Sequence, residues 1–272
     1  MKSNYLEELA ENGYTIVRNV LTASEVEEAR GILDKLDSPL SAMVPSEVLS
    51  MPLIKTFPFK EKAISAFKSI FGKPYVVYPN FTVRQNVYVP WHLDVAFHNE
   101  VGGIGDTPNF LQCAIYLQDN NNDGGIDVIP GSHKRIKVNG QYYTPAKNLD
   151  VFSRSKTVDS KAGDLVLFDG RTLHASSGNG VSNQFSKKKY GVFFTTSSIE
   201  ANKERMLEHL FNRKEVKKAT GEIVKDPRFE DMKKLEFPIS YPEVAIKASK
   251  NGDIRFLTLK DKINSKKELQ EI

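Results

Sequence analysis

The sequence lacks the features that mark disulfide-stabilised and membrane-spanning proteins. Its 272 residues include a single cysteine, Cys113, so no disulfide can form within the chain, and this composition is typical of a reducing compartment. No run approaches the roughly 18–20 consecutive apolar residues of a transmembrane helix. The N-terminal residues MKSNYLEELAENG contain no apolar signal-peptide core. We therefore expect a cytoplasmic protein with no membrane partner.

An excess of positive or negative charge is also absent from most of the sequence. The formal net charge is +4, and residues 201–272 account for all of it, with 17 Lys and Arg against 13 Asp and Glu. Nucleic-acid-binding proteins concentrate basic residues on one surface, whereas acidic residues are interleaved with the basic ones here. We expect no nucleic-acid partner, and we hypothesise that the C-terminal positive charge contacts an anionic small-molecule substrate.

The first third of the chain has helical patterns. Thr22-Ala-Ser-Glu25 has the spacing of a capping box, in which each of the two side chains accepts a hydrogen bond from the other residue's backbone N–H. Apolar residues then follow at helical spacing. The face that we expect to be buried consists of Val26, Ala29, Leu33 and Leu36. Further helices are expected at about 4–12, 60–71 and 200–213.

From Pro74 the pattern changes to short β-branched or aromatic runs separated by Gly, Pro, Asn and Asp, which is typical of strands and turns. Several short strands after helices predict a mainly β (α+β) fold, a sandwich or jelly roll buttressed by helices at both ends of the chain. No linker is evident, so we expect residues 1–272 to form a single domain. Its jelly-roll core would span about 74–198, and the extension 199–272 would pack on it.

Three residues could form a metal site. His92-Leu-Asp94 follows a predicted strand, and alternate side chains of an extended chain point to the same face. About eighty residues later, a buried strand leads through a turn into His174. Two imidazoles and one carboxylate form the facial triad that holds Fe(II) and leaves coordination positions open. Taken singly, each part has a simpler explanation, a surface turn or a core histidine.

These segments resemble the phytanoyl-CoA dioxygenase family of Fe(II)/2-oxoglutarate oxygenases. The resemblance spans about residues 10–200 and rests on four motifs in order: WHLD, IYLQDNNNDGGIDVIPGSHK, GDLVLFDGRTLHASSGN and KKYGVFFTTS. It implies a double-stranded β-helix (a cupin-like jelly roll), with His92, Asp94 and His174 as catalytic iron ligands. The implied cofactors are Fe(II), 2-oxoglutarate and O2. The implied reaction hydroxylates an unactivated C–H bond of a small molecule and decarboxylates 2-oxoglutarate to succinate. Asp94 favours hydroxylation over halogenation, because halogenases of this kind replace that carboxylate with a small residue.

The family's arginine for the far carboxylate of 2-oxoglutarate is absent from the expected stretch, SKKKYGVFFTTS. Lys188 is the nearest match, with Lys187 and Lys189 as neighbours, and a lysine can pair with a carboxylate as a point charge. A solvated strand end would explain the three lysines equally well. Arg171 or Arg84 could bind the carboxylate instead.

Two further residues, Gln85 and Thr195, lie on predicted strands and could donate hydrogen bonds to the co-substrate. Two alternatives stay open. One is a cupin-type metal protein that uses the same triad without 2-oxoglutarate, which the missing arginine favours. The other is a non-catalytic binding protein that has kept the fold, against which the intact triad argues.

Overall fold

The structure is a computed structural model. It describes residues 4–36, 42–87, 89–94, 109–120, 124–134, 136–138, 141–143, 151–177, 188–199, 203–216, 222–236 and 238–257. Lys187 lies outside these residues. Within them, none of the helices has the length and apolar character needed to cross a bilayer.

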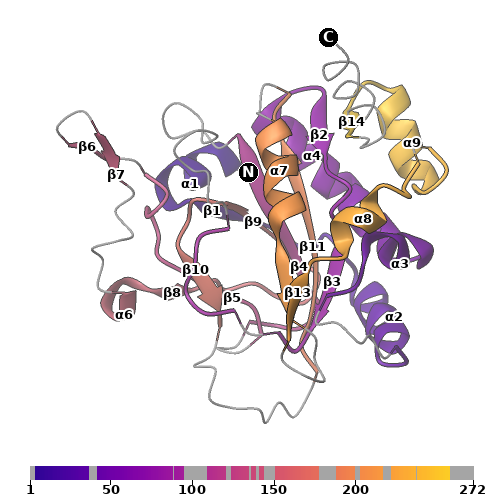
Figure 1. Cartoon of the computed structure of the whole chain (residues 1–272), viewed down its shortest axis with the longest axis horizontal. Helices are drawn as coiled ribbons and strands as arrows, with labels where there is room; N and C mark the ends of the chain where they lie inside the picture. The colour runs from indigo at the N-terminus through magenta and orange to yellow at the C-terminus, as the bar shows by residue number, and fades with distance from the viewer. Residues whose placement is uncertain are drawn as a thin grey trace.

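A seven-stranded mixed sheet is the centre of the molecule (Figure 1). Its strand order is β1-β9-β4-β11-β2-β14, with β3 paired to β11 beside β2. The strands are β1 (Tyr14–Val17), β2 (Tyr75–Val77), β3 (Thr82–Gln85), β4 (Phe110–Tyr116), β9 (Leu165–Asp169), β11 (Tyr190–Ser197) and β14 (Ile254–Phe256). All pairs are antiparallel except β14 with β2. Most of these strands come from the predicted β region, while β1 and β14 come from opposite ends of the chain.

A smaller sheet faces one side of the main sheet. Its order is β10-β5-β8, formed by β10 (His174–Ser176), β5 (Ile126–Val128) and β8 (Lys156–Thr157). Val128 and Val158 pack in one buried cluster with Val166 and Phe168 of β9. Two sheets that share such a core form a β-sandwich, and together with the helices they confirm the predicted mainly β (α+β) fold. The sheets of the described part do not close into a barrel.

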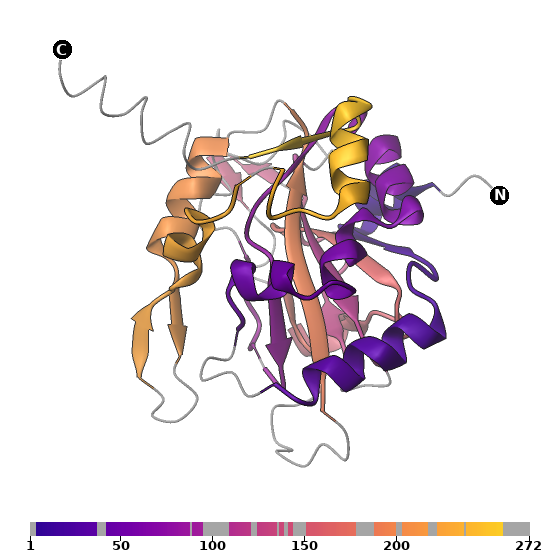
Figure 2. The same cartoon turned by 90° about the vertical axis from the view of Figure 1, so that its right-hand side faces the viewer.

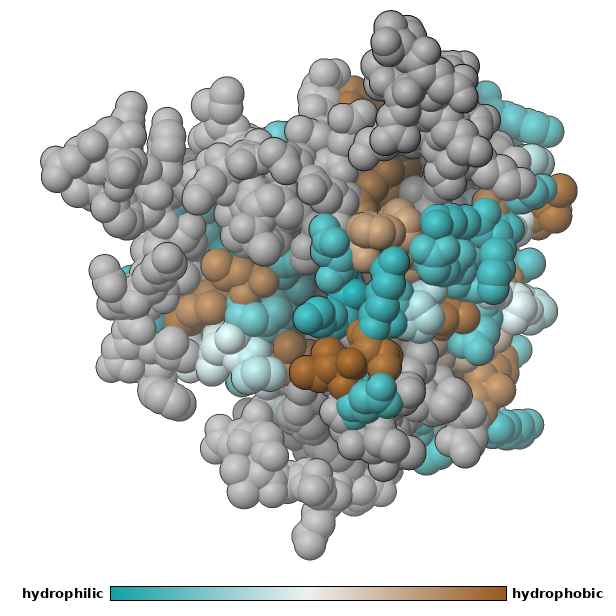
Figure 3. All heavy atoms as spheres, viewed as in Figure 1, coloured by the Kyte–Doolittle hydropathy of each residue, from teal (hydrophilic) through white to brown (hydrophobic). Residues whose placement is uncertain are grey.

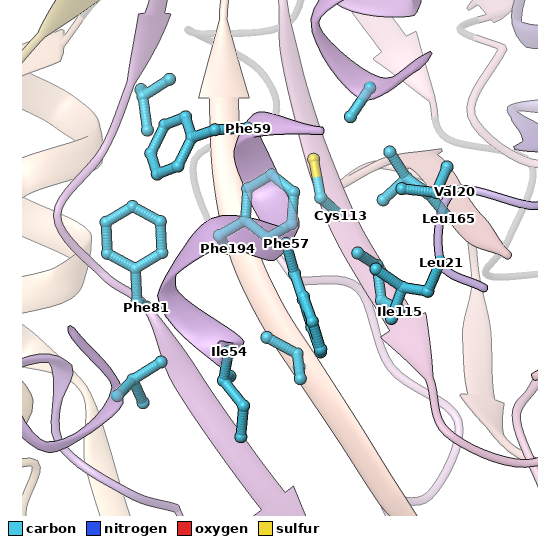
Figure 4. Close-up of a cluster of buried hydrophobic side chains, with 14 of the residues drawn as sticks. Val20, Leu21, Ile54, Phe57, Phe59, Phe81, Cys113, Ile115, Leu165 and Phe194 are labelled. Atoms are coloured by element: carbon cyan, nitrogen blue, oxygen red, sulfur yellow. The ribbon is translucent and has the colours of Figure 1, made fainter. Parts of the chain in front are cut away.

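Helices cover the opposite side of the main sheet (Figure 2). They are α1 (Tyr5–Asn12), α2 (Ala23–Leu33), α3 (Pro45–Ser50), the 3-10 helix η1 (Ile54–Phe59) and α4 (Glu61–Phe71). Phe57 and Phe59 of η1 meet Cys113 and Phe194 of the sheet in one buried hydrophobic cluster (Figure 4). Leu165 and Leu167 join this cluster, whereas Val166 and Phe168 face the small sheet, because successive strand residues point to opposite faces.

The predicted capping box at the start of α2 is present. Thr22 Oγ1 accepts from the Glu25 N–H at 3.2 Å, and a Glu25 carboxylate oxygen accepts from the Thr22 N–H at 2.8 Å. Val26, Ala29 and Leu33 are buried as expected. Leu36 is 40% exposed, which contradicts the prediction, because α2 ends at Leu33 and its apolar face ends with it.

The C-terminal elements pack on the main sheet and on the N-terminal helices. They are α7 (Lys203–Asn212), β12 (Lys214–Val216), β13 (Ile223–Lys225), α8 (Arg228–Met232), α9 (Glu243–Lys250) and β14. Smaller elements between β5 and β8 are β6 (Ile136–Val138), β7 (Gln141–Tyr143) and α6 (Val151–Arg154). Ala245 and Ala248 of α9 join the same apolar cluster as the N-terminal helices. A single domain for the whole chain stays a prediction, which this shared core supports.

Candidate active site

Backbone hydrogen bonds bring the three predicted metal ligands together. The N–H of His92 donates to the carbonyl of His174 at 2.9 Å, and the N–H of His174 donates to the carbonyl of His92 at 3.1 Å. The Asp94 N–H donates to the Gly170 carbonyl at 3.1 Å. One ligand atom from each of His92, Asp94 and His174 lies within 4.8 Å of the others. The short segment before residue 95 therefore lies against β10, although about eighty residues separate them in sequence.

The two imidazoles present the same ring nitrogen to a common point. His92 Nδ1 donates to the Pro90 carbonyl at 2.7 Å, and His174 Nδ1 donates to the Thr172 carbonyl at 2.8 Å. A proton held on Nδ1 leaves the Nε2 lone pair available as a ligand. The Nε2 atoms of His92 and His174 lie 3.4 Å and 3.7 Å from the two Asp94 carboxylate oxygens.

Burial and charge act against each other in this cluster. Burial raises the pKa of the Asp94 carboxyl, but His174 and His92 outweigh it, and the pKa lies well below its usual range. Burial lowers the pKa of His174 despite the nearby Asp94 charge. Burial also acts to lower the pKa of His92, but its contact with Asp94 prevails and raises it. An ionised carboxylate beside a buried neutral imidazole is the state that binds a divalent cation.

This donor set fits iron(II). Two imidazole nitrogens and one carboxylate on one side of the ion match the facial triad, which leaves further positions for other ligands. The Phe168 ring lies 4.7 Å from the His174 ring, so one flank of the site is apolar. The other side opens into a cavity.

The cavity has a volume of about 380 Å³, within the range of small-molecule sites. One wall consists of main-sheet residues of alternating position: Thr82 and Arg84 of β3, Gln112 and Tyr116 of β4, and Gly191 and Phe193 of β11. The small sheet contributes Ile126 and His174, and the C-terminal segment contributes Arg213, Lys214 and Arg228. On the face of the molecule turned to the viewer in Figure 1, hydrophilic side chains gather in the middle, beside apolar ones (Figure 3).

The structure places Lys188 outside the cavity. Its side chain is exposed, and its Nζ lies 3.5 Å from a carboxylate oxygen of Asp34, just beyond α2. Lys189 is the lysine that lines the cavity: it is 7% exposed, and its Nζ donates to the Gly125 carbonyl at 3.0 Å. Its Nζ also lies 5.9 Å from the centre of the Tyr116 ring. Lys189, which is in phase with Gly191, therefore lines the cavity, and Lys188 does not.

Two other predicted contacts also lie away from the cavity. Gln85 is out of phase with Thr82 and Arg84, and it is not among the residues that line the cavity. The Arg171 guanidinium is 4% exposed and binds both carboxylate oxygens of Asp169, at 2.5 to 3.0 Å. Arg171 is thus committed to a structural ion pair within its own turn.

Thr195 is fully buried behind two residues that line the cavity. Its hydroxyl donates to Gln112 Oε1 at 2.9 Å and accepts from Asn80 Nδ2 at 2.8 Å. Gln112 and Asn80 both line the cavity. Asn80 is 8% exposed, and its Oδ1 has no partner among the described residues. Thr195 therefore orients two amides that face the cavity.

The sequence did not single out Asn80, Gln112 or Arg213. For Gln112, strand alternation relative to Thr195 was an available signal, because β4 neighbours β11. Asn80 lies between β2 and β3, where alternation gives no such signal. For Arg213 the only signal was the positive charge of the C-terminal residues.

The comparisons with known proteins agree with this arrangement. The family model for phytanoyl-CoA dioxygenase (PhyH) matches residues 65–187. Among curated proteins, none matches the chain.

Several solved structures have a similar fold. The non-heme alpha ketoglutarate dependent epimerase SnoN from nogalamycin biosynthesis is 18% identical, with a TM-score of 0.54 over 72% of this chain and 80% of SnoN. HygX from Streptomyces hygroscopicus, with nickel, 2-oxoglutarate and hygromycin B bound, is 15% identical, with a TM-score of 0.53 over 74% of this chain and 88% of HygX. EctD from S. alaskensis is 16% identical, with a TM-score of 0.55 over 73% of this chain and 77% of EctD.

At these identities the solved structures establish the fold alone. The family match is narrower than the span of about 10–200 expected from the motifs, and it includes His92, Asp94 and His174. The resemblance to the phytanoyl-CoA dioxygenase (PhyH) family is therefore confirmed, over residues 65–187 of this chain.

Proposed function

We propose that this protein is a cytoplasmic Fe(II)- and 2-oxoglutarate-dependent oxygenase that hydroxylates an unactivated C–H bond of a small-molecule substrate. One observation carries the proposal. His92, Asp94 and His174 converge at the wall of a cavity that also contains a buried lysine, Lys189. The family match supports the same activity.

His92, Asp94 and His174 would hold the iron. The bound ion, with 2-oxoglutarate chelated to it, supplies reductive activation of O2, coupled to decarboxylation of the co-substrate to succinate. The protein orients the ligands through the Pro90 and Thr172 carbonyls, which fix both imidazole rings. Such supporting hydrogen bonds are a general requirement of metal sites.

Lys189 would bind the far carboxylate of 2-oxoglutarate. Its ammonium is held between the Gly125 carbonyl and the face of Tyr116, so its position is fixed before a ligand arrives. A lysine ammonium in this position can pair with a carboxylate as a point charge, and the far carboxylate of 2-oxoglutarate would be its ligand. Apolar neighbours, Phe168 and Ile126, would keep bulk water from the space between lysine and metal.

Hydroxylation is one of several outcomes that this fold can serve. SnoN is described as an epimerase and SnoK as a carbocyclase, and both are alpha ketoglutarate dependent. We favour hydroxylation because Asp94 fills the position that a halogenase leaves open. The neighbours HygX and SnoN were crystallised with the small molecules hygromycin B and nogalamycin RO, which supports a small-molecule substrate.

The activity can be tested without knowing the substrate. Iron(II)-loaded protein is supplied with 2-oxoglutarate and O2, and succinate is measured, because these enzymes turn over slowly without substrate. We expect succinate to form in the wild type and to fall to background in Asp94→Ala. Bound iron with no succinate, and no binding of 2-oxoglutarate, would favour the cupin-type alternative.

Adjacent lysines provide a matched pair for the co-substrate site. Lys189→Ala and Lys188→Ala remove the same charge one residue apart, one from the cavity and one from the exposed pair with Asp34. We expect Lys189→Ala to weaken 2-oxoglutarate binding roughly tenfold or more, the worth of a charge-assisted hydrogen bond. Lys188→Ala should bind it like the wild type. The reverse pattern would restore the sequence-based assignment.

A further inference from the structure

A wall of positive charge faces the candidate metal site from outside the family match. Arg213 and Lys214 lie where α7 meets β12, Arg228 begins α8, and all three line the cavity. They lie beyond residues 65–187. The family resemblance therefore does not explain why this chain places three cations beside the triad.

The segment that carries these cations is fixed at two points. Met206, Leu207 and Leu210 of α7 pack in one cluster with residues of β2 and β4. At the other end, the Asp231 carboxylate of α8 accepts from the N–H and the hydroxyl of Ser46, both at 2.7 Å. Figure 2 shows α7 and the β12–β13 hairpin standing beside the main sheet, on the side away from α2 and α4. Arg213 is thus held over the cavity.

One buried carboxylate serves two guanidinium groups. Asp226, whose side chain is 2% exposed, accepts from Arg228 Nε at 2.8 and 2.9 Å, and it lies 3.9 Å from Arg213 Nε. Arg228 hydrogen-bonds both carboxylate oxygens of Asp226, so its positive charge balances the negative charge of Asp226. Arg213 keeps a net positive charge, and its side chain is 28% exposed.

Cations outnumber carboxylates among the described residues that line the cavity: Arg84, Lys189, Arg213, Lys214 and Arg228 against Asp94. Iron(II) and Lys189 together carry three positive charges, which Asp94 and dianionic 2-oxoglutarate balance. Asp94 and Arg213 line the same cavity. The remaining space next to the metal therefore borders the guanidinium of Arg213, whose ion-pair partner among the described residues, Asp226, is 3.9 Å away and also pairs with Arg228.

We propose that Arg213 binds an acidic group of the substrate, so that the substrate is a small organic anion held between this guanidinium and the metal triad. This inference rests on the proposed function and narrows its substrate class. A guanidinium presents a planar fork of N–H donors that matches carboxylate, phosphate and sulfate oxygens. A cavity of about 380 Å³, shared with the co-substrate, limits the substrate to a small molecule.

Binding of simple anions tests the inference. The probes are inorganic phosphate, sulfate and propionate, with propionamide as the neutral counterpart of propionate. Each is titrated under anaerobic conditions into the iron(II)-loaded protein, with and without 2-oxoglutarate, and binding is followed by calorimetry. The variants are Arg213→Gln, Arg213→Lys and the control Lys188→Gln, which removes a charge from the exposed pair with Asp34.

We expect at least one anion to bind the wild type and propionamide not to bind. Arg213→Gln should lower the affinity for the anion roughly tenfold or more. The affinity of Arg213→Lys should lie between those of Arg213→Gln and the wild type, and Lys188→Gln should match the wild type. The anion that binds most tightly identifies the acidic group. Arg213→Lys keeps the charge near Asp226, so it covers the case in which Arg213→Gln does not fold.

Two results would overturn the inference. One is equal anion binding by Arg213→Gln and the wild type. The other is loss of 2-oxoglutarate binding in Arg213→Gln with anion binding unchanged, which would make Arg213 a co-substrate residue. Failure of the proposed function looks different: the wild type would bind iron but no 2-oxoglutarate. Titrations without 2-oxoglutarate would then still show whether Arg213 binds the anions.

Discussion

The two faces of the main sheet use the same strands for different purposes. On the helix-covered face, residues such as Leu165, Leu167 and Cys113 are fully buried among apolar side chains. On the cavity face, the neighbouring positions of β4 and β11 are Gln112 and Thr195, which hydrogen-bond each other, and Gln112 borders the cavity. The first face supplies stability, and the second carries polar groups that a ligand would complete.

This difference shows how one strand can meet two demands. Alternation separates them, so a cavity residue can change without disturbing the helix-covered core. The cost lies on the cavity face, where Asn80 Oδ1 has no partner among the described residues, and where Asp94 sits between two imidazoles. Groups placed in this way are characteristic of functional sites.

The largest effect is expected from loss of a metal ligand. His174→Ala removes a buried imidazole from the cavity side and should weaken iron(II) binding by more than roughly 100-fold, the upper end of what loss of a supporting group alone costs. Succinate formation should fall to background. Anaerobic metal titration measures the affinity, and near-wild-type iron binding by this variant would remove His174 from the site.

Truncation of a core residue on the helix-covered face should lower stability and leave metal binding unchanged. Leu167→Ala should lower the free energy of unfolding by about 4 kcal/mol, because it leaves a cavity among fully buried neighbours. Iron affinity should not change while the protein is folded. Chemical denaturation together with metal titration would separate the two quantities.

Gln112→Ala is the matched change on the cavity face, since Gln112 neighbours Cys113, the register partner of Leu167. It should lower the free energy of unfolding by only about 1 kcal/mol, the contribution of one hydrogen bond. Similar losses from Leu167→Ala and Gln112→Ala would contradict the division of labour between the faces.

The Asp226 ion pair predicts a pH dependence. Arg228 holds the pKa of the Asp226 carboxyl below its usual range, although burial acts to raise it. The stabilisation is therefore complete above the unfolded pKa and is lost as the pH falls through the folded value. Asp226→Asn should lower the free energy of unfolding by about 3 kcal/mol at neutral pH, and the difference from the wild type should shrink below about pH 4. Unfolding curves over this pH range provide the check, and a constant difference would contradict it.

The smallest effect is expected on the surface. Lys188→Ala breaks the exposed pair with Asp34, which should be worth less than about 1 kcal/mol and should fade at high salt. Thermal unfolding at low and high salt measures it. A larger loss would mean that Lys188 has a structural role that its exposure does not suggest.

Local sequence signals predicted the elements well. The capping box of Thr22 and Glu25, the helix that ends at Gly72 and the strand from Tyr190 all depend on neighbouring residues, and the structure contains each of them. The prediction for Leu36 was wrong because the periodicity continued past the last helical turn.

The candidate site was predictable where motif and alternation coincide. His92 and Asp94 share a face, and the motif order placed His174 with them. Lys188 was chosen as the nearest match by alignment to the apolar strand, whereas Lys189 is in phase with Gly191 and Phe193 of β11, which line the cavity. Arg213 could not be found this way, because the packing of α7 and α8 on distant elements places it.

The most direct test of the account is anaerobic titration of iron(II)-loaded protein with 2-oxoglutarate, followed by visible absorption. Chelation of the keto acid by iron produces a charge-transfer band. The account predicts this band in the wild type, its loss in His174→Ala, and a higher concentration of 2-oxoglutarate for half-saturation in Lys189→Ala. Bound iron with no band in the wild type would contradict it.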